Sequence, residues 1–183
     1  MKNQFLVGRN TYLRPLERQD ASLIVQWLND PEVTRTLAIY RPINLQAEEE
    51  FIAMIYESES EFVLGITAQD SDGLIGVTGL HRMDFKNRHA NFGIAIGDKD
   101  QWGKGYGTEV TSLMLRHAFE GLNMNRVWLH VYENNVRGIK TYERTGFRKE
   151  GLLRQERYSE GRYWDTIVMA ILREEWDALQ PRR

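Results

Sequence analysis

A short glycine-rich segment has the residue types and spacing that best fit a chemical role. Residues 101–109 place glycine at three alternate positions, Gly103, Gly105 and Gly107. Glycine lets the backbone approach a ligand closely and turn without a Cβ clash. Because the segment lies between an expected strand and an expected helix, its N–H groups would point outward at the positive end of the helix dipole. This predicts an anion site suited to phosphates, to which Lys104 could add a charge.

Two common phosphate-binding motifs do not fit this loop. A dinucleotide fingerprint reads Gly-x-Gly-x-x-Gly, but Thr108 follows Gly107, so the third glycine stands at the wrong position. A P-loop requires Gly-x-x-x-x-Gly-Lys followed by Ser or Thr, and the sequence contains no such run. A nucleotide-binding protein that uses the loop in another way remains an alternative.

A second segment, residues 131–147, lies a short distance after the loop. It contains Asn135 at the start of an expected short helix, then Tyr142, and then Gly146. Together the loop and the pattern Tyr-x-x-x-Gly-Phe resemble the GNAT superfamily of acetyl-CoA-dependent N-acetyltransferases. The resemblance covers nearly the whole chain in the order of elements, and residues 89–147 in the motifs.

Within that superfamily, the chain is most similar to the branch of ribosomal-protein N-terminal acetyltransferases and spermidine acetyltransferases. The similarity rests on residues 102–107, which read Trp-Gly-Lys-Gly-Tyr-Gly, and on residues 161–165, which read Gly-Arg-Tyr-Trp-Asp. Many relatives begin the loop with Gln or Arg where this chain has Trp102. Because the side chain there is not the main phosphate contact, we expect function to survive this change.

The resemblance implies where acetyl-CoA would bind. In the family, the strand before the loop bulges and splays from the next strand, and the pantetheine arm lies in the cleft between them. Those strands would be residues 90–96 and 126–132. Backbone groups of Ile94, Ala95 and Ile96 would bond the arm and hold the thioester. The residues that would wrap the pyrophosphate through backbone N–H groups are Trp102, Gly103, Lys104, Gly105, Tyr106, Gly107 and Thr108.

The resemblance also implies direct transfer of the acetyl group to an amine. The amine has a pKa near 10 and must lose a proton before attack, and the leaving thiolate, with a pKa of about 8.5, benefits from a proton donor. Tyr142 matches the family's tyrosine beside the sulfur and is the candidate catalytic acid. Asn135 matches the asparagine that contacts CoA, although it is also suited to capping a helix. Direct attack requires no enzyme nucleophile, and the sequence contains no cysteine.

The general base is left open. Relatives often carry Glu on the strand before the loop, in an Ala-Glu-x-Gly pattern, whereas Asn91 stands at that position in this chain. An amide does not accept a proton at neutral pH. Ordered water, Glu133, His81 or an acidic residue of the N-terminal helices are the candidates that remain.

The net charge of −2 conceals an uneven distribution. Residues 17–72 hold twelve acidic and three basic residues, a balance of −9. The totals of 26 acidic and 24 basic residues leave 14 acidic and 21 basic residues elsewhere, a balance of +7. In the family the N-terminal helices and the final hairpin form the acceptor cleft, so an acidic wall there would attract an ammonium group. We expect a cationic acceptor such as a polyamine, a peptide N-terminus or an aminoglycoside; charges that merely solvate helix faces are the alternative.

Apolar periodicity places these motifs in an α/β (α+β) fold. We expect a helix that Asp20 caps and that ends before Pro31, and a second helix that Asn44 caps. Together with the resemblance, this predicts a single GNAT-like domain with a mixed, mostly antiparallel sheet, a splayed central strand pair and about four flanking helices. The other expected helices are residues 108–120 and 136–144, and the expected strands are residues 11–16, 61–69, 74–83, 89–96, 126–132, 147 onward and 164–172.

Composition bounds the function classes. A chain of 183 residues with 42% apolar and 27% charged residues fits one globular domain, residues 1–183, rather than a disordered tail or a fibre. Zero cysteines exclude disulfide scaffolds and Cys-ligated zinc, and the four histidines show no metal-ligand spacing, so we expect no metal. A pI of about 6.1 without a basic-aromatic stripe argues against a nucleic-acid partner.

The remaining expectations concern location and partners. No window approaches the ~20 apolar residues that span a bilayer, and the first ten residues lack a secretory apolar run. We therefore expect a soluble, cytoplasmic protein with no membrane partner, which acts on a small-molecule or peptide amine. The exposed final strands suggest a homodimer. A module that keeps the fold and binds acetyl-CoA without catalysis is the main alternative to an enzyme.

Overall fold

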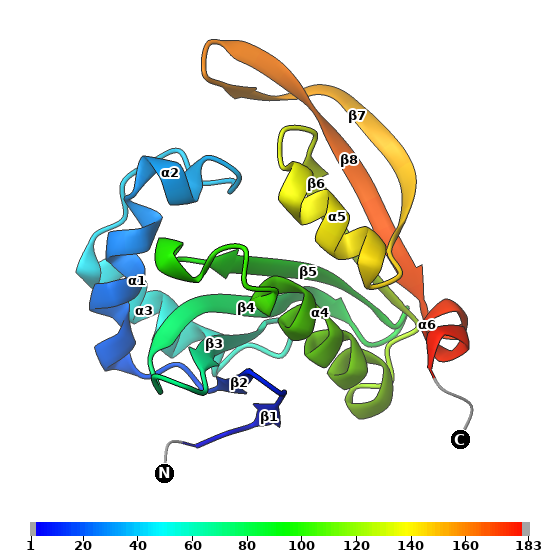
Figure 1. Ribbon diagram of the computed structural model, residues 1–183, viewed down its shortest axis with the longest axis horizontal. Coiled ribbons are helices and arrows are strands. Elements are labelled where there is room, and N and C mark those ends of the chain that lie inside the picture. Colours follow the sequence, from blue (N-terminus) through cyan, green and yellow to red (C-terminus); the bar gives the residue numbers. More distant parts are fainter. Residues whose placement is uncertain (1–2, 181–183) are drawn as a thin grey trace.

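The computed structural model describes residues 3–180, which form one eight-stranded sheet with helices on both faces (Figure 1). The strand order is β1-β2-β3-β4-β5-β6-β8-β7, and every neighbouring pair is antiparallel except β5 and β6. The strands are β1 (Leu6–Val7), β2 (Thr11–Arg14), β3 (Phe62–Ala68), β4 (Leu74–Asp84), β5 (His89–Ile96), β6 (Arg126–Tyr132), β7 (Arg148–Ser159) and β8 (Arg162–Leu172). The predicted mixed, mostly antiparallel sheet is confirmed.

Six α-helices lie within the described residues, against the four that were expected. They are α1 (Ala21–Leu28), α2 (Pro31–Thr34), α3 (Leu45–Ile55), α4 (Tyr106–Arg116), α5 (Val136–Arg144) and α6 (Arg173–Leu179). The two additional helices, α2 and α6, are shorter than eight residues. Helices this short are too brief for the repeating apolar pattern by which a helix is predicted from sequence. Pro31, which was expected only to follow the end of a helix, is also the first residue of α2, a position where its missing N–H costs nothing.

The apolar side chains form two clusters, one on each face of the sheet. On one face, α4 packs Val110, Leu113 and Met114 against strand residues such as Leu80. On the other face, α1 and α3 pack against residues of β3, with Ile24 and Ile52 among the buried members of that cluster. Because side chains alternate between faces along a strand, each strand residue can be assigned to the α4 face or to the α1/α3 face.

The sheet is splayed at its centre, as predicted. β5 and β6 are paired only from His89 to Asn91, opposite Arg126 to Trp128. Both strands continue beyond this point, β5 to Ile96 and β6 to Tyr132, and each keeps its antiparallel partner on its outer side. The second half of the parallel pair is therefore open, with unpaired backbone groups on its inner edges.

The β7–β8 hairpin extends beyond the rest of the sheet and returns toward α2 (Figure 1). Arg35, next to α2, forms an ion pair with Glu160 at the hairpin turn, with 2.9 Å between Nε and Oε1. Arg157 of β7 also donates from Nη2 to the Arg35 carbonyl at 2.8 Å. These contacts connect the N-terminal helices to the last strands, although 125 residues separate Arg35 from Glu160.

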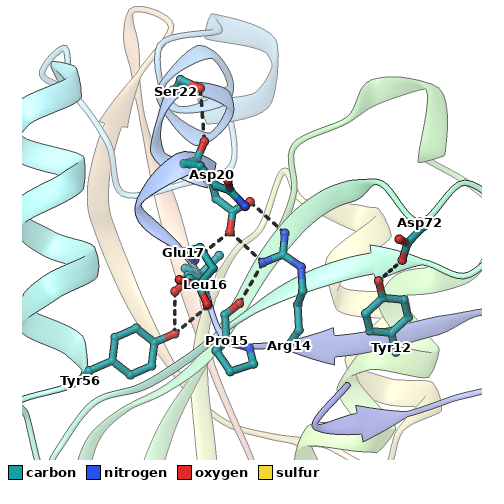
Figure 2. Close-up of polar contacts among 10 residues, drawn as sticks. Tyr12, Arg14, Pro15, Leu16, Glu17, Asp20, Ser22, Tyr56 and Asp72 are labelled. Carbon is teal, nitrogen blue, oxygen red and sulfur yellow. Dashed lines mark hydrogen bonds and ion pairs between the residues drawn. The ribbon is translucent and has the colours of Figure 1, made fainter. Parts of the chain in front are cut away.

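A buried ion pair fixes the path from β2 into α1 (Figure 2). Arg14 donates from Nη1 and Nη2 to the two carboxylate oxygens of Asp20, at 2.7 and 2.8 Å. Asp20 is the N-cap residue of α1, as predicted, but its carboxylate accepts from the Glu17 N–H at 2.8 Å, which caps the 3₁₀ turn before α1 rather than α1 itself. The Tyr56 hydroxyl, just after α3, accepts from the Leu16 N–H at 2.6 Å and joins this turn to α3. The pair thus positions α1 and α3 on the sheet.

Candidate active site

The open edge of β5 presents backbone groups to the splay at alternate residues. The Gly93 carbonyl accepts from Thr78 Oγ1 of β4 at 2.9 Å, and the Gly97 N–H donates to the Ile75 carbonyl at 2.9 Å. The backbone N–H and C=O groups of the odd-numbered β5 residues therefore point toward β4. By the alternation of an antiparallel ladder, the N–H and C=O groups of Ile94 and Ile96 face the splay, whereas those of the intervening Ala95 face β4.

The glycine loop follows β5 and leads into α4. Gly103 and Gly105 adopt positive φ angles of 79° and 87°, a conformation that residues with a side chain rarely adopt. A Cβ at either position would meet no atom within 4 Å, so the space above both glycines is open. In the described chain, the N–H groups of Gly103, Lys104 and Gly105 make no hydrogen bond, and the first helical N–H groups lack partners as in any helix. This cradle fits a phosphate group.

The other loop residues are divided between packing and backbone roles. The Trp102 indole donates from Nε1 to the Ile96 carbonyl at 2.8 Å and stacks under Arg137, which fastens the loop to β5 and α5. Lys104 Nζ donates to Gln101 Oε1 at 2.9 Å. Tyr106 is buried in the core, so only its N–H faces the loop. The Thr108 N–H bonds the Gly105 carbonyl at 3.1 Å and closes the first turn.

Tyr142 lies on the α4 face beside the splay. Its ring meets Phe92 of β5 edge-on, with 6.2 Å between centroids, and the side chain is 8% exposed. Burial raises the pKa of its hydroxyl to about 12. Within residues 3–180 this hydroxyl has no hydrogen-bond partner. It is a neutral donor at physiological pH that the protein leaves available.

Two asparagines at the ends of the splay hydrogen-bond to nearby backbone groups. Asn135 is the N-cap of α5, and its Oδ1 accepts from the Gly138 N–H at 2.9 Å, as the capping interpretation predicted. Its contact with CoA stays a prediction. Asn91 lies where β5 and β6 part, and its Nδ2 donates to the Trp128 carbonyl at 3.3 Å. An amide that bridges the last paired position fixes the point at which the splay begins.

The carboxylates of the acidic N-terminal part differ in their surroundings. Several of its carboxylates are paired, including Asp30 with Lys99 at 2.8 Å and Glu49 with Arg18 at 2.6 Å. Glu48 differs, because it is 5% exposed and its carboxylate has no hydrogen-bond or ion-pair partner among the described residues. Burial raises the pKa of this carboxyl.

Glu48 lies near the end of α3 that adjoins the splay side of the sheet. Asn29, which follows α1, both donates to and accepts from the backbone of Ile43 just before α3, at 2.7 and 2.9 Å. In the same region the Trp27 ring covers the end of β5, since a Cβ at Gly97 would lie 2.0 Å from it. Glu48 is the one helical carboxylate of this end that is both buried and unpartnered among the described residues.

None of the helices in residues 3–180 is long and apolar enough to cross a bilayer. No group of three His, Asp or Glu side chains in the same range is arranged to hold a metal ion.

Comparison with known proteins identifies relatives of this arrangement. The "Acetyltransferase (GNAT) domain" family matches residues 10–148. The uncharacterized N-acetyltransferase p20 of Bacillus licheniformis is 31% identical over 167 residues, which cover 90% of this chain and 93% of that protein. The spermidine N(1)-acetyltransferase of Escherichia coli K12 is 29% identical over 171 residues, covering 90% of this chain and 87% of that protein.

A solved structure shows the same fold. The spermidine N-acetyltransferase of Vibrio cholerae, crystallised with CoA and spermine, superposes with a TM-score of 0.84 and 28% identity, covering 91% of this chain and 98% of that one. The predicted resemblance is confirmed, and spermidine acetyltransferases are among the relatives. The chain belongs to the GNAT family of N-acetyltransferases.

Proposed function

We propose that this chain transfers the acetyl group of acetyl-CoA to a primary, cationic amine by direct attack, within the splay between β5 and β6. The observation that carries the proposal is the parting of the two strands immediately before a loop whose N–H groups are unbonded. The gap suits a long, narrow arm, and the loop suits the pyrophosphate at its end. The family membership and the CoA bound to the Vibrio cholerae relative support this interpretation.

Each predicted binding residue has a defined task in this proposal. Gly103, Lys104 and Gly105 would donate N–H groups to the pyrophosphate, and Tyr106 and Gly107 would add the first N–H groups of α4. The backbone of Ile94 and Ile96 would bond the pantetheine arm. Because Trp102 already occupies the Ile96 carbonyl, the Ile96 N–H is the group left for the substrate. Ala95, Thr108 and Asn135 would shape the cleft around these contacts.

The chemistry requires a donor for the leaving sulfur and a donor for the carbonyl oxygen. Acetyl-CoA, when bound, supplies a thioester that an amine can attack. Tyr142 would protonate the departing thiolate, a step that suits a hydroxyl kept neutral by burial. The Ile94 N–H would stabilise the negative charge that develops on the carbonyl oxygen. Neither role requires a nucleophile from the enzyme.

The acceptor side favours an ammonium group. Glu48 is a buried carboxylate without a partner, and a buried charge is costly unless it is paired. An ammonium group in the cleft would supply that partner. Spermidine acetyltransferases among the relatives favour the same class of acceptor. A polyamine is therefore the first acceptor to test, ahead of N-terminal peptides and aminoglycosides.

The test is a thiol-release assay with acetyl-CoA against four acceptor classes: polyamines, N-terminal peptides, aminoglycosides and neutral or anionic amines. We expect release with cationic amines and none, or much less, with the others. Acetylation confined to neutral or anionic amines would contradict the acceptor assignment. A rise in melting temperature with acetyl-CoA but no release with any amine would instead identify a silent binding module.

A further inference from the structure

The general base of the proposed reaction is not supplied by the residue that often holds it in relatives. Asn91 stands there, and its amide bonds the Trp128 carbonyl. Glu133, a second candidate, is exposed at the end of β6, where Oε1 accepts from the Asp165 N–H at 3.1 Å. A third candidate, His81, lies on β4 beside the splay, and its role in proton transfer rests on the proposed function.

His81 lies on the α1/α3 face of β4, beside the splay. Its neighbour Leu80 is buried in the α4-side cluster, so His81 points to the opposite face. The imidazole covers two glycines that are directly paired across β4 and β5. A Cβ at Gly79 would lie 2.9 Å from Nε2 of His81, and a Cβ at Gly93 would lie 3.2 Å from it. The absence of side chains at both positions is what lets the ring reach β5.

Glu61 fixes the state of this imidazole. Its Oε2 lies 2.5 Å from Nδ1 of His81. A carboxylate can only accept, so Nδ1 carries a proton, and in the neutral imidazole the lone pair is on Nε2, the ring nitrogen between Gly79 and Gly93. Among residues 3–180, Glu61 is the one ionisable group in hydrogen-bond or ion-pair contact with His81. A neutral Asn91 faces it from β5.

A bulge in β4 holds Glu61 in place. The register of β4 against β5 shifts directly after His81, and Arg82 has a positive φ of 50°. This turns the Arg82 N–H onto Glu61 Oε1, at 3.2 Å. Bulges next to active sites commonly redirect a side chain, and an unusual backbone angle is tolerated where it serves such a purpose.

We propose that His81 is the general base that accepts the proton of the acceptor amine, and that Glu61 is its positioning residue. Gly93 precedes Ile94, whose backbone faces the splay, so Nε2 lies beside the edge on which the thioester would be held. Tyr142 lies on the α4 face and His81 on the α1/α3 face. The base and the acid therefore flank the splay from opposite sides of the sheet.

The proton balance uses both residues. The acceptor arrives as an ammonium ion and gives one proton to Nε2 of His81, which passes it to solvent. The freed lone pair forms the C–N bond at the thioester carbon, and the C–S bond breaks as the carbonyl re-forms. The thiolate takes a proton from Tyr142, and the second proton lost by the amine nitrogen restores the tyrosine. The products are an acetamide and CoA thiol.

The experiment compares His81→Gln, Glu61→Gln and His130→Gln in the intact chain, with thiol release measured against pH and acetyl-CoA binding measured by thermal shift. His130 is an exposed histidine on β6, across the splay, and is the matched control. We expect His81→Gln to lower kcat about 100-fold or more at pH 7, to leave acetyl-CoA binding unchanged and to remove the acid limb of the pH profile. Glu61→Gln should keep that limb and lower kcat by a smaller factor, because the imidazole keeps Nε2 but loses the carboxylate that positions it through Nδ1. His130→Gln should match the wild type.

A second acceptor separates base catalysis from simple damage to the fold. With an amine that is already neutral at pH 7, such as a hydrazide, His81→Gln should regain most of the lost rate, because no proton has to be removed before attack. Added imidazole should likewise rescue His81→Ala with cationic acceptors. An equal loss with both kinds of amine and no rescue would overturn the role of His81.

The two proposals fail in different ways. If the wild-type chain neither binds acetyl-CoA nor releases thiol, the proposed function is wrong. If it acetylates amines while His81→Gln retains its rate within threefold and keeps the wild-type pH profile, the proposed function stands and His81 is not the base. Loss of activity in His130→Gln instead would place the base on β6.

Discussion

Replacing Gly105 with alanine tests whether the loop is built for a ligand or only for a turn. Gly105 has a φ of 87° and an open Cβ position, and its N–H is unbonded among the described residues. Gly161, in the turn between β7 and β8, has a φ of 78° and an equally open Cβ position. The two sites therefore impose the same backbone strain on alanine, and Gly161→Ala is the matched control.

The expected loss of stability is the same for both variants. Alanine in the left-handed region costs about 1–2 kcal/mol. In a domain of this size, 1 kcal/mol lowers the melting temperature by about 2–4 °C. Both Gly105→Ala and Gly161→Ala should thus melt about 2–8 °C below the wild type without ligand.

Only the loop variant should lose affinity for CoA. A methyl group above Gly105 would enter the cradle and displace a phosphate from its N–H donors. Losing contacts to a charged group costs about 1.5–3 kcal/mol, which is about 10- to 100-fold in Kd. At a CoA concentration of about 100 times the wild-type Kd, ligand stabilises the wild type by about 2.7 kcal/mol. The rise in melting temperature should fall to about half or less in Gly105→Ala and stay unchanged in Gly161→Ala.

The assay is a thermal shift titration with CoA, complemented by calorimetric measurement of Kd. Equal CoA affinities for both variants and the wild type would refute the cradle, since the glycines would then serve the backbone turn alone. A loss of CoA affinity in Gly161→Ala as large as in Gly105→Ala would also refute it, because strain rather than a lost contact would explain the effect.

Three further variants test Tyr142 as the catalytic acid, Glu48 as the carboxylate for the acceptor, and the buried ion pair between Arg14 and Asp20. Tyr142→Phe should lower kcat by about 10²–10⁴-fold without changing the Kd for CoA; since burial raises the pKa of Tyr142 to about 12, the wild-type rate should show no falling limb from this group up to pH 10 in a stopped assay. Glu48→Gln should stabilise the fold at pH 7 by about 1 kcal/mol or more in urea unfolding, because a buried carboxyl whose pKa is raised destabilises the folded state above that pKa. The gain in stability should vanish at acid pH, below the ordinary carboxyl range, and the KM of Glu48→Gln for cationic amines should rise. No gain in stability at pH 7, or a gain of equal size in exposed Glu57→Gln, would contradict the assignment of Glu48 as a buried, unpaired carboxylate. Asp20→Asn should cost about 3–5 kcal/mol by leaving Arg14 buried and unpaired, and Arg14→Met combined with Asp20→Leu should recover much of it; an additive double variant would show that the pair is not coupled.

Local sequence signals predicted most elements because they act over a few residues. Asn44 and Asn135 cap the helices they were expected to cap, with N–H donors at 2.9 Å. The strands over residues 89–96 and 126–132 have the bounds that were predicted. The helix after the glycine loop begins at Tyr106 rather than residue 108, because Gly105 in the left-handed region serves as its N-cap.

Residue types and spacing by themselves predicted a glycine-rich anion loop and most of the elements around it, since glycine freedom and apolar periodicity are properties of the local chain. The acetyltransferase fold and the role of Tyr142 came from the resemblance to the GNAT superfamily. Only the tertiary structure decided how the sheet brings distant residues together. The contact of Glu61 with His81 and the isolation of Glu48 depend on strand register and helix packing. Register is fixed by long-range burial of one face, which no local window contains. For this reason the general base stayed open in the sequence, and strand pairing is what favours His81.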